Sequence, residues 1–202
     1  MKRSMRIQNL GGARALILHR PHPTVAALTR QLSAIGLEVV QAWPEVGAEA
    51  LAMDFVFFDA DMGHDEMFPW PVRQPPMPMI ALIGSEAPGR IEWALRAGAH
   101  AQLLKPVGNS GAFSALLIAR DAFDAQRALF AEIADLRRRL DERQTVVRAV
   151  TMLAVRGKTE AEAYAQLRQM AMAWRISFED AAGRIVGGSG DEEGGGGKRI
   201  RG

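Results

Sequence analysis

The sequence of 202 residues contains no cysteine, so a disulfide, a thiolate nucleophile and a zinc site built on cysteine are all excluded. No apolar run is long enough to span a membrane, and the apolar stretch at residues 13–18 is too short for a signal-peptide core. The formal charge is only +2 at pH 7, which makes no electrostatic case for a general polyanion binder. We therefore expect a cytoplasmic protein that does not bind a membrane.

Catalytic groups are missing as well. No nucleophile, general base and orienting residue occur together, and no glycine-rich phosphate loop follows a predicted strand. His19 and His22 lie in a loop with Pro21 and Pro23 and without a paired acid, which favours solvated histidines over metal ligands. We expect neither an enzyme nor a bound metal or cofactor.

Five short apolar runs alternate with helical patterns in the first half of the chain. The runs predict strands at residues 13–18, 37–40, 54–59, 79–83 and 101–104. Thr24 is expected to cap a helix that Gly36 ends, and a second helix over residues 90–97 ends at Gly98. The proline-rich residues 69–78 predict an irregular segment in place of a helix. This alternation is typical of an α/β fold with a doubly wound, five-stranded parallel sheet covered on both faces.

An acid ends the third predicted strand, and a Lys-Pro pair follows the fifth; these residues are Asp59 and Lys105-Pro106. In a parallel sheet of this kind, functional groups gather at the carboxyl ends of the strands. Over residues 13–118 the pattern resembles the receiver domain of two-component response regulators, which has a flavodoxin-like fold. The resemblance implies that Asp59 stands at the phospho-accepting position and Lys105 at the phosphate-contacting position.

The rest of the receiver's phosphorylation site is replaced. His19 and Arg20 stand where an acidic pair is expected after the first strand, so the oxygen ligands that Mg²⁺ prefers are gone. Ile83 stands where a hydroxyl residue is expected after the fourth strand. Without the metal, nothing comparable balances the charge of a transferring phosphoryl group. We predict a pseudo-receiver in which Asp59 and Lys105 form an ion pair, with phosphorylation of Asp59 as the alternative.

An unbroken helical period runs from about residue 112 to residue 145. Its apolar seam alternates spacings of three and four, as in a coiled coil, and Arg137 and Gln144 interrupt it as register-fixing polar residues. The alternative is one helix packed back on the sheet, which the wider apolar stripe at residues 116–118 favours for its start. We expect the first part of the helix to dock on the sheet and the part after it to form a dimer. Acids close to residues 137–139 predict a salt-bridged face there. The predicted dimerisation residues are Phe123, Phe130, Ile133, Leu140 and Val147.

Three short amphipathic helical patterns follow between residues 144 and 186. The first ends at Gly157, and the second opens with a capping box formed by Thr159 and Glu162. The third ends before Gly187. A module of this size has little core of its own, so it needs a partner surface or a nucleic-acid target.

A set of spaced residues across this module carries a family resemblance. The set comprises Ala149, Met152, Leu153, Gly157, Thr159, Glu162, Ala163, Tyr164, Leu167, Arg168, Met170, Ala171, Met172, Asp180, Ala181, Ala182, Ile185 and Val186. It resembles the ANTAR domain of the AmiR and NasR transcription antitermination regulators, a three-helix RNA-binding module. One departure is Val150, because the family usually carries Lys at that position.

The resemblance implies binding to hairpins in leader RNA. Hairpin loops are read by stacking and hydrogen bonds to splayed bases, with cations on the phosphates. Arg148, Lys158 and Arg168 would supply charge, Tyr164 a ring, and Thr159 a helix N-terminus that attracts phosphate. The alanines would leave room for close approach of the RNA. The full predicted RNA-binding set is Arg148, Ala149, Lys158, Thr159, Ala163, Tyr164, Arg168 and Ala171.

The predicted organisation has five parts. They are a flexible N-terminus (1–12), a receiver-like domain (13–118), a coiled-coil dimerisation helix (119–143), an ANTAR module (144–186) and a disordered tail (187–202). The layout resembles the amidase-operon branch of the family, which implies a homodimeric antiterminator held inactive by a small-molecule-sensing negative regulator protein. Two alternatives stay open: an antiterminator switched by phosphorylation of Asp59, and a protein-interaction adaptor that does not bind RNA.

Overall fold

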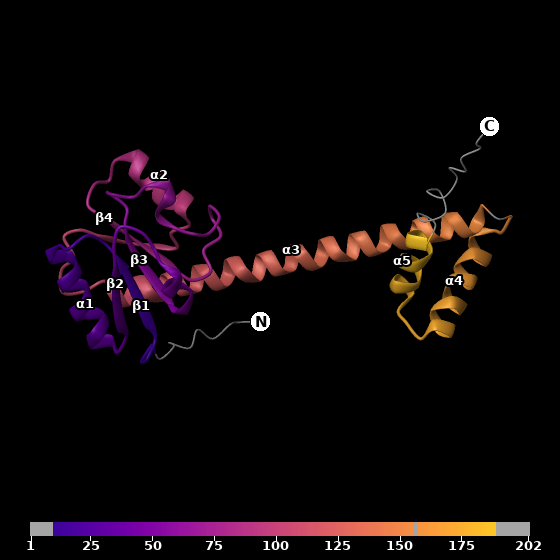
Figure 1. Cartoon of the computed structure of the whole chain (residues 1–202), viewed down its shortest axis with the longest axis horizontal. Helices are drawn as coiled ribbons and strands as arrows, with labels where there is room; N and C mark the ends of the chain where they lie inside the picture. Colours follow the sequence, from indigo (N-terminus) through magenta and orange to yellow (C-terminus); the bar gives the residue numbers. More distant parts are fainter. Residues whose placement is uncertain (1–9, 156, 189–202) are drawn as a thin grey trace, which may run out of the picture. The chain divides into compact units, whose positions relative to one another are not determined.

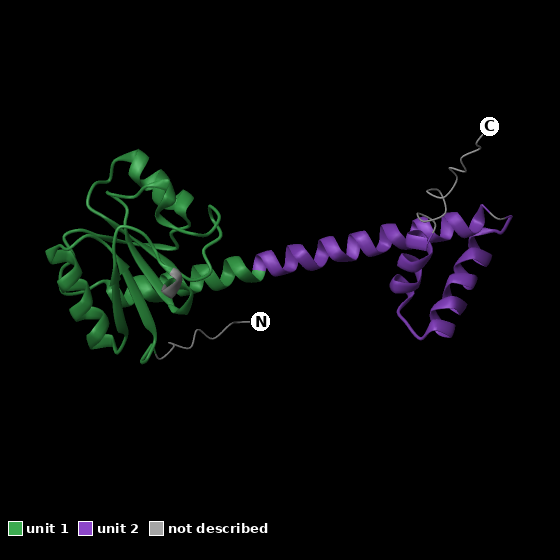
Figure 2. Ribbon diagram, in the orientation of Figure 1, with its two compact units in different colours: residues 1–128 green, residues 129–202 purple. Residues whose placement is uncertain are grey.

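The computed structural model describes residues 10–155 and 157–188, without the side chains of residues 48 and 49. The chain divides into two compact units, an N-terminal unit of residues 1–128 and a C-terminal unit of residues 129–202 (Figure 2). None of the helices in the described ranges is both long and apolar enough to cross a membrane.

The N-terminal unit is built on a five-stranded sheet with strand order β2-β1-β3-β4-β5, in which every pair is parallel (Figure 1). This confirms the predicted doubly wound fold. The strands are β1 (Arg14–Leu18), β2 (Glu38–Ala42), β3 (Phe55–Asp59), β4 (Met79–Ile83) and β5 (Ala101–Leu104). The connecting helices are α1 (Pro23–Ile35), η1 (Ala48–Ala52), η2 (Asp65–Met67) and α2 (Pro88–Ala97), and α3 (Ala112–Ala154) follows β5.

The central strand β3 is buried along its whole length, and its side chains point alternately to the two faces of the sheet. Phe55 and Phe57 belong to a core that includes α1 and the start of α3. Val56 and Phe58 belong to a second core, which includes α2 and parts of the segments joining β2 to β3 and β3 to β4. Continuous apolar strands are what a parallel sheet covered on both faces requires.

Two local features of this unit bear on the predictions. The proline-rich residues 69–78 contain no regular helix, as predicted. The cap of α1, however, is His22 and not Thr24: His22 Nδ1 accepts a hydrogen bond from the Thr24 backbone N–H, and Thr24 is buried inside the helix. Pro23 then occupies the first helical turn, where its missing N–H costs nothing.

α3 is one continuous helix of 43 residues that contributes to both units. The prediction that Phe123 begins a dimer seam was wrong, because its side chain is only 5% exposed and packs edge-on against His100 of its own unit. Beyond it, Phe130, Leu140 and Val147 are each more than half exposed, so the remaining seam stays a prediction.

The C-terminal unit consists of the end of α3, α4 (Glu160–Trp174) and α5 (Phe178–Gly188). Its core is made largely of small side chains, which lets the helices approach closely. The buried members are Ala149, Val150, Leu153, Ala163, Leu167, Ala171, Ala181 and Ala182. Gly157 has φ +84° in the turn after α3, a left-handed conformation that favours glycine.

The predictions for the chain ends fall mostly outside the described residues, since residues 1–9 and 189–202 are not described. Leu10 is buried in the N-terminal core, and the Gly12 N–H donates to the Gly36 carbonyl. One prediction for the other end needs correction. Gly187 and Gly188 belong to α5, which continues past its predicted end.

Candidate functional site

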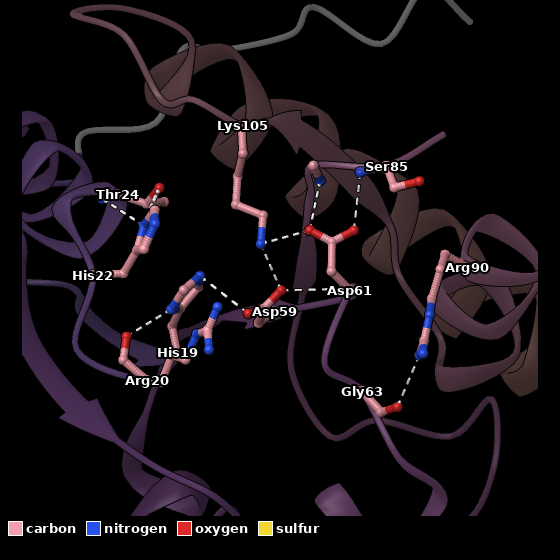
Figure 3. A network of polar contacts seen from close by, with 11 residues as sticks. His19, Arg20, His22, Thr24, Asp59, Asp61, Gly63, Ser85, Arg90 and Lys105 are labelled. Atoms are coloured by element: carbon pink, nitrogen blue, oxygen red, sulfur yellow. Dashed lines mark hydrogen bonds and ion pairs between the residues drawn. The ribbon is translucent and has the colours of Figure 1, made fainter. Parts of the chain in front are cut away.

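The register of the sheet brings the side chains of His19, Asp59 and Lys105 together at the carboxyl ends of the strands. Leu18 pairs with Phe58, so the residue after β1, His19, lies beside Asp59 at the end of β3. Ile83 pairs with Leu104, which places Lys105 beside the residue after β4. Lys105 Nζ lies 2.7 Å from Asp59 Oδ1, so the predicted ion pair is present (Figure 3).

A second carboxylate, which the sequence analysis missed, completes this cluster. Asp61 Oδ2 lies 2.7 Å from Lys105 Nζ and accepts from the Gly84 N–H at 2.8 Å, while its Oδ1 accepts from the Ser85 N–H at 3.0 Å. Partial burial raises the pKa of Asp61, but the hydrogen bonds from Lys105 and from the Ser85 and Gly84 amides outweigh it and hold the pKa below its usual value. The available signal was a second acid, two residues after the one that ends β3.

His19 is buried, so the prediction of a solvated histidine was wrong for this residue. Its Nδ1 lies 2.7 Å from the Arg20 carbonyl oxygen, which only accepts, so Nδ1 carries a hydrogen. Its Nε2 lies 3.2 Å from Asp59 Oδ2 without the alignment of a hydrogen bond.

Asp59 is enclosed by its neighbours. Asp59 is 1% exposed, its Oδ1 accepts from Lys105 and from the Asp61 N–H, and its Oδ2 faces His19. Ile83 is the buried last residue of β4, and the two residues after the strand, Gly84 and Ser85, donate their N–H groups to Asp61. Within the described ranges, no group of three or more His, Cys, Asp or Glu side chains is placed to hold a metal ion. Both carboxylate oxygens of Asp59 therefore face neighbouring groups of the same unit.

In the C-terminal unit, three of the predicted RNA-binding residues are buried. Ala149 and Ala163 are fully buried and Ala171 nearly so, all in the core shared by α3, α4 and α5. Their small side chains let the three helices pack closely. Val150, where the family usually carries Lys, is also a core residue here.

The N-terminus of α4 is already occupied by a carboxylate. Thr159 Oγ1 accepts from the Glu162 N–H at 3.3 Å, and the Thr159 N–H donates to Glu162 Oε2 at 2.8 Å, which confirms the predicted capping box. These hydrogen bonds from Thr159 lower the pKa of Glu162. Because Glu160 lies in the same turn, two negative side chains compete with any phosphate there. The geometry therefore speaks against Thr159 as a phosphate site.

The other predicted RNA-binding residues are exposed. Arg148 and Arg168 form no ion pair with any described residue, so their guanidinium groups are available. Lys158 donates to Gln166. Tyr164 is 43% exposed, and its ring packs at 4.9 Å, centroid to centroid, against Phe178 at the start of α5.

The arginine run of α3 behaves as a salt-bridged face, as predicted. Arg138 bridges Asp135 at 2.5 Å and Glu142 at 2.7 Å, and Arg139 bridges Asp135 at 2.8 Å. All of these side chains are at least a third exposed, so each pair contributes little to stability.

Comparison with known proteins finds two family matches. The model described as "AmiR, N-terminal" matches residues 13–120, and the model described as "ANTAR domain" matches residues 134–186. The transcriptional regulatory protein PdtaR of Mycobacterium tuberculosis, strains CDC 1551 / Oshkosh and ATCC 25618 / H37Rv, is 33% identical over 106 residues. That region is 52% of this chain and 52% of PdtaR, so the chain spans about half the length of these curated relatives.

Comparison with solved structures also finds similar chains. The Rec1 domain of ShkA, crystallised in complex with c-di-GMP, is 24% identical with a TM-score of 0.42, over 54% of this chain and 93% of that one. A response regulator from Thermotoga maritima is 19% identical with a TM-score of 0.42, over 54% of this chain and 98% of that one.

Proposed function

Since the chain belongs to the ANTAR family of transcription antitermination regulators and carries an AmiR-type N-terminal domain, we propose that it binds a hairpin in a leader transcript. Bound protein would favour the antiterminator fold of that RNA, so that the polymerase reads through into the downstream operon. At the coarser level, the chain is a response-regulator-like transcriptional regulator. It would act in the cytoplasm, where transcripts are made, and it would not be an enzyme.

The observation that carries this proposal is the ANTAR match over residues 134–186, which coincides with a three-helix unit that has its own core. Arg148 and Arg168 are exposed on it without partners among the described residues. Unpaired guanidinium groups are suited to phosphates and to stacking on unpaired bases.

The experiment is a gel shift of the purified chain on the leader RNA upstream of its own operon, beside an RNA of equal length without paired elements, at stated salt. Arg168→Ala should weaken leader binding. Arg30 is an exposed arginine of α1 in the N-terminal unit, and Arg30→Ala is the matched control. This variant loses the same charge and should bind the leader as the wild type does. A folded wild-type chain that does not prefer the leader would overturn RNA recognition and leave the protein-interaction adaptor as the leading function.

We also propose that phosphorylation does not control this protein. Support comes from Asp59, whose oxygens already face Lys105, the Asp61 amide and His19. Incubation with a small-molecule phosphoryl donor and Mg²⁺ should leave the intact mass unchanged. A mass increase of one phosphoryl group that Asp59→Asn abolishes would restore the phosphorylation-switched alternative.

The control proposed instead is sequestration by a small-molecule-sensing negative regulator protein, as in the branch of the family with the same layout. The partner should be encoded next to this chain and should co-purify with it. Adding the partner's ligand should then separate the two proteins. Co-purification that no ligand disrupts would contradict this form of control.

A homodimer formed through α3 completes the proposal. Phe130 and Leu140 are more than half exposed, and a row of exposed apolar groups on one helix indicates an interaction surface. Leu140→Glu should shift the chain towards monomer in sedimentation equilibrium. Leu51→Glu is the matched control, because Leu51 is an exposed leucine of the N-terminal unit. A wild-type monomer at micromolar concentration would refute the dimer.

A further inference from the structure

A pocket in the N-terminal unit lies between α2 and the strands β4 and β5. Its volume is about 180 Å³. An apolar cavity of about 150 Å³ is large enough to hold benzene, whereas pockets for drug-sized ligands begin at about 300 Å³. The size of the pocket therefore suits a molecule with one small ring.

Four alanines leave this space open. Ala81 of β4, Ala94 of α2 and Ala101 of β5 line the pocket together with Ala99, which lies in the connection from α2 to β5. The connection is short because Gly98 ends α2 with φ +96°, a left-handed conformation that favours glycine. The walls of the pocket thus belong to a helix, two strands and a tight turn, so its shape is held by the fold.

The lining of the pocket is uncharged. Ile83 and Ile91 add apolar surface to the alanines, and the described residues of the lining include no Asp, Glu, Lys or Arg. The one titratable side chain is His100, whose pKa is lowered by burial while its hydrogen bond to Gln126 acts in the opposite direction. Its imidazole is therefore neutral at pH 7. Because an ion is costly to move from water into such surroundings, the lining favours a neutral ligand.

One polar side chain of the lining can orient a ligand. Gln102 is exposed on β5 and lines the pocket. Its side-chain amide has no hydrogen-bond partner in the part of the chain that the structure describes, so it can both donate and accept. Small-molecule sites commonly combine an apolar lining with a few polar groups that fix the orientation of the ligand. A ring that carries one hydrogen-bonding group would match this lining.

His100 connects the pocket to α3. Its Nδ1 accepts from the Met79 N–H at 3.2 Å, so its Nε2 carries the hydrogen and donates to Gln126 Oε1 at 3.0 Å. The imidazole also packs edge-on against Phe123, with ring centroids 5.3 Å apart. Gln126 and Phe123 belong to α3, and all of these contacts lie inside the N-terminal unit. A ligand that touches the imidazole would therefore act on α3 through a single side chain.

We propose that this pocket binds a small, neutral, ring-shaped molecule with one hydrogen-bonding group, and that His100 transmits its binding to α3. The apolar lining takes the ring, and Gln102 pairs with the polar group. Such a molecule acts on this chain directly, as an input separate from the sensing partner protein. The site does not depend on RNA binding, because every residue that forms it belongs to the N-terminal unit.

The test is an NMR titration of the full ¹⁵N-labelled chain with phenol as the probe. Phenol should cause saturable shifts of the side-chain amide signals of Gln102 and Gln126, whereas the signal of Gln41, which is exposed on β2, should not move. Benzoate has the same ring with an ionised carboxylate and should bind at least about tenfold more weakly. Toluene lacks the hydrogen-bonding group and should bind about threefold or more weakly than phenol does.

Protein variants that fill the pocket provide the matched comparison. Gln102→Phe puts a ring into the space that the ligand needs and should weaken phenol binding at least about tenfold. Gln41→Phe is the same substitution at an exposed position of β2, the strand at the opposite edge of the sheet, and should keep wild-type binding. Ala99→Leu fills the pocket from the turn after α2 and should act as Gln102→Phe does, which guards against a disturbance of β5. Circular dichroism of each variant checks that the chain is folded.

Several outcomes would overturn the proposal. A folded wild type without saturable shifts at millimolar phenol overturns the site, and so does equal weakening by Gln102→Phe and Gln41→Phe. Benzoate that binds as tightly as phenol overturns the preference for a neutral ligand. Shifts at Gln102 without a shift at Gln126 overturn the transmission to α3. If phenol does not bind and Gln102→Phe changes the sedimentation of the chain, this face is a protein contact and the ligand site is refuted.

Discussion

Replacing Lys105 by methionine tests how much its ion pairs with Asp59 and Asp61, at the carboxyl ends of the strands, stabilise the fold. The ammonium group of Lys105 lies 2.7 Å from both Asp59 and Asp61, and methionine keeps most of the side-chain volume without the charge. Asp59 is 1% exposed, and in the variant only His19 and the Asp61 N–H would remain beside its carboxylate. In the unfolded chain both carboxylates are hydrated, so the loss of Lys105 raises the free energy of the folded state only.

The expected loss is set by the buried carboxylate. Removing one partner of a buried ion pair costs about 3–5 kcal/mol, and the remaining His19 places the value near the lower end. Asp59→Asn should cost only about 1 kcal/mol, because Lys105 keeps Asp61 as a partner. The double variant should lose about 1–2 kcal/mol less than the sum of the single losses, since no buried charge is left unpaired.

Urea unfolding followed by tryptophan fluorescence measures these losses. Three of the four tryptophans, Trp43, Trp70 and Trp93, belong to the N-terminal unit, so the signal reports mainly on that unit. The midpoint should fall while the slope stays constant. Two results would refute the dependence of the buried Asp59 carboxylate on Lys105. One is a loss of less than about 1 kcal/mol in Lys105→Met, and the other is a double variant whose loss equals the sum of the two single losses.

Three further predictions test other parts of the structure. Thr159→Ala should destabilise the C-terminal unit by about 1 kcal/mol through loss of the cap, seen as a lower midpoint in a thermal melt; an unchanged midpoint would contradict the capping box. Burial lowers the pKa of His100 despite its hydrogen bond to Gln126. As the pH falls below the ordinary value of 6.5, the unfolded chain therefore binds a proton at His100 before the folded chain does. The free energy of unfolding should decrease over this window, down to the lowered pKa. The pH dependence of unfolding in that window should shrink in His100→Gln, and an unaltered slope would rule the residue out. Ala163→Leu should overpack the core by about 1–3 kcal/mol and lose RNA binding only as far as the unit unfolds; a stable variant that no longer binds RNA would show that Ala163 contacts the RNA after all.

The regular parts of the fold were predictable because each has a local cause. The apolar runs at 79–83 and 101–104 match β4 and β5 residue for residue. Each run is short and bounded by helical patterns, so the strand bounds could be read from the sequence. The capping box was predictable for the same reason, because Thr159 and Glu162 interact across a single turn.

The contacts that depend on register were not predictable from local pattern. His19 looked solvated because it lies between a strand and prolines, yet the pairing of Leu18 with Phe58 buries it beside Asp59. Asp61 gave no periodic signal and acquires its role from the amides after β4.

The alanines of the ANTAR module show a different limit of sequence reasoning. A small residue at a matched position is compatible with close approach of a ligand and with close approach of a helix. Only the packing of α3, α4 and α5 distinguishes the two, and it places Ala149, Ala163 and Ala171 in the core.

The most direct test of the central claim is transcription in vitro from a template that carries the chain's own leader and terminator. The purified chain should raise the fraction of full-length transcript, and Arg168→Ala should raise it less than Arg30→Ala does. A terminated fraction that stays constant over protein concentrations that saturate leader binding would contradict antitermination, even if the RNA is bound.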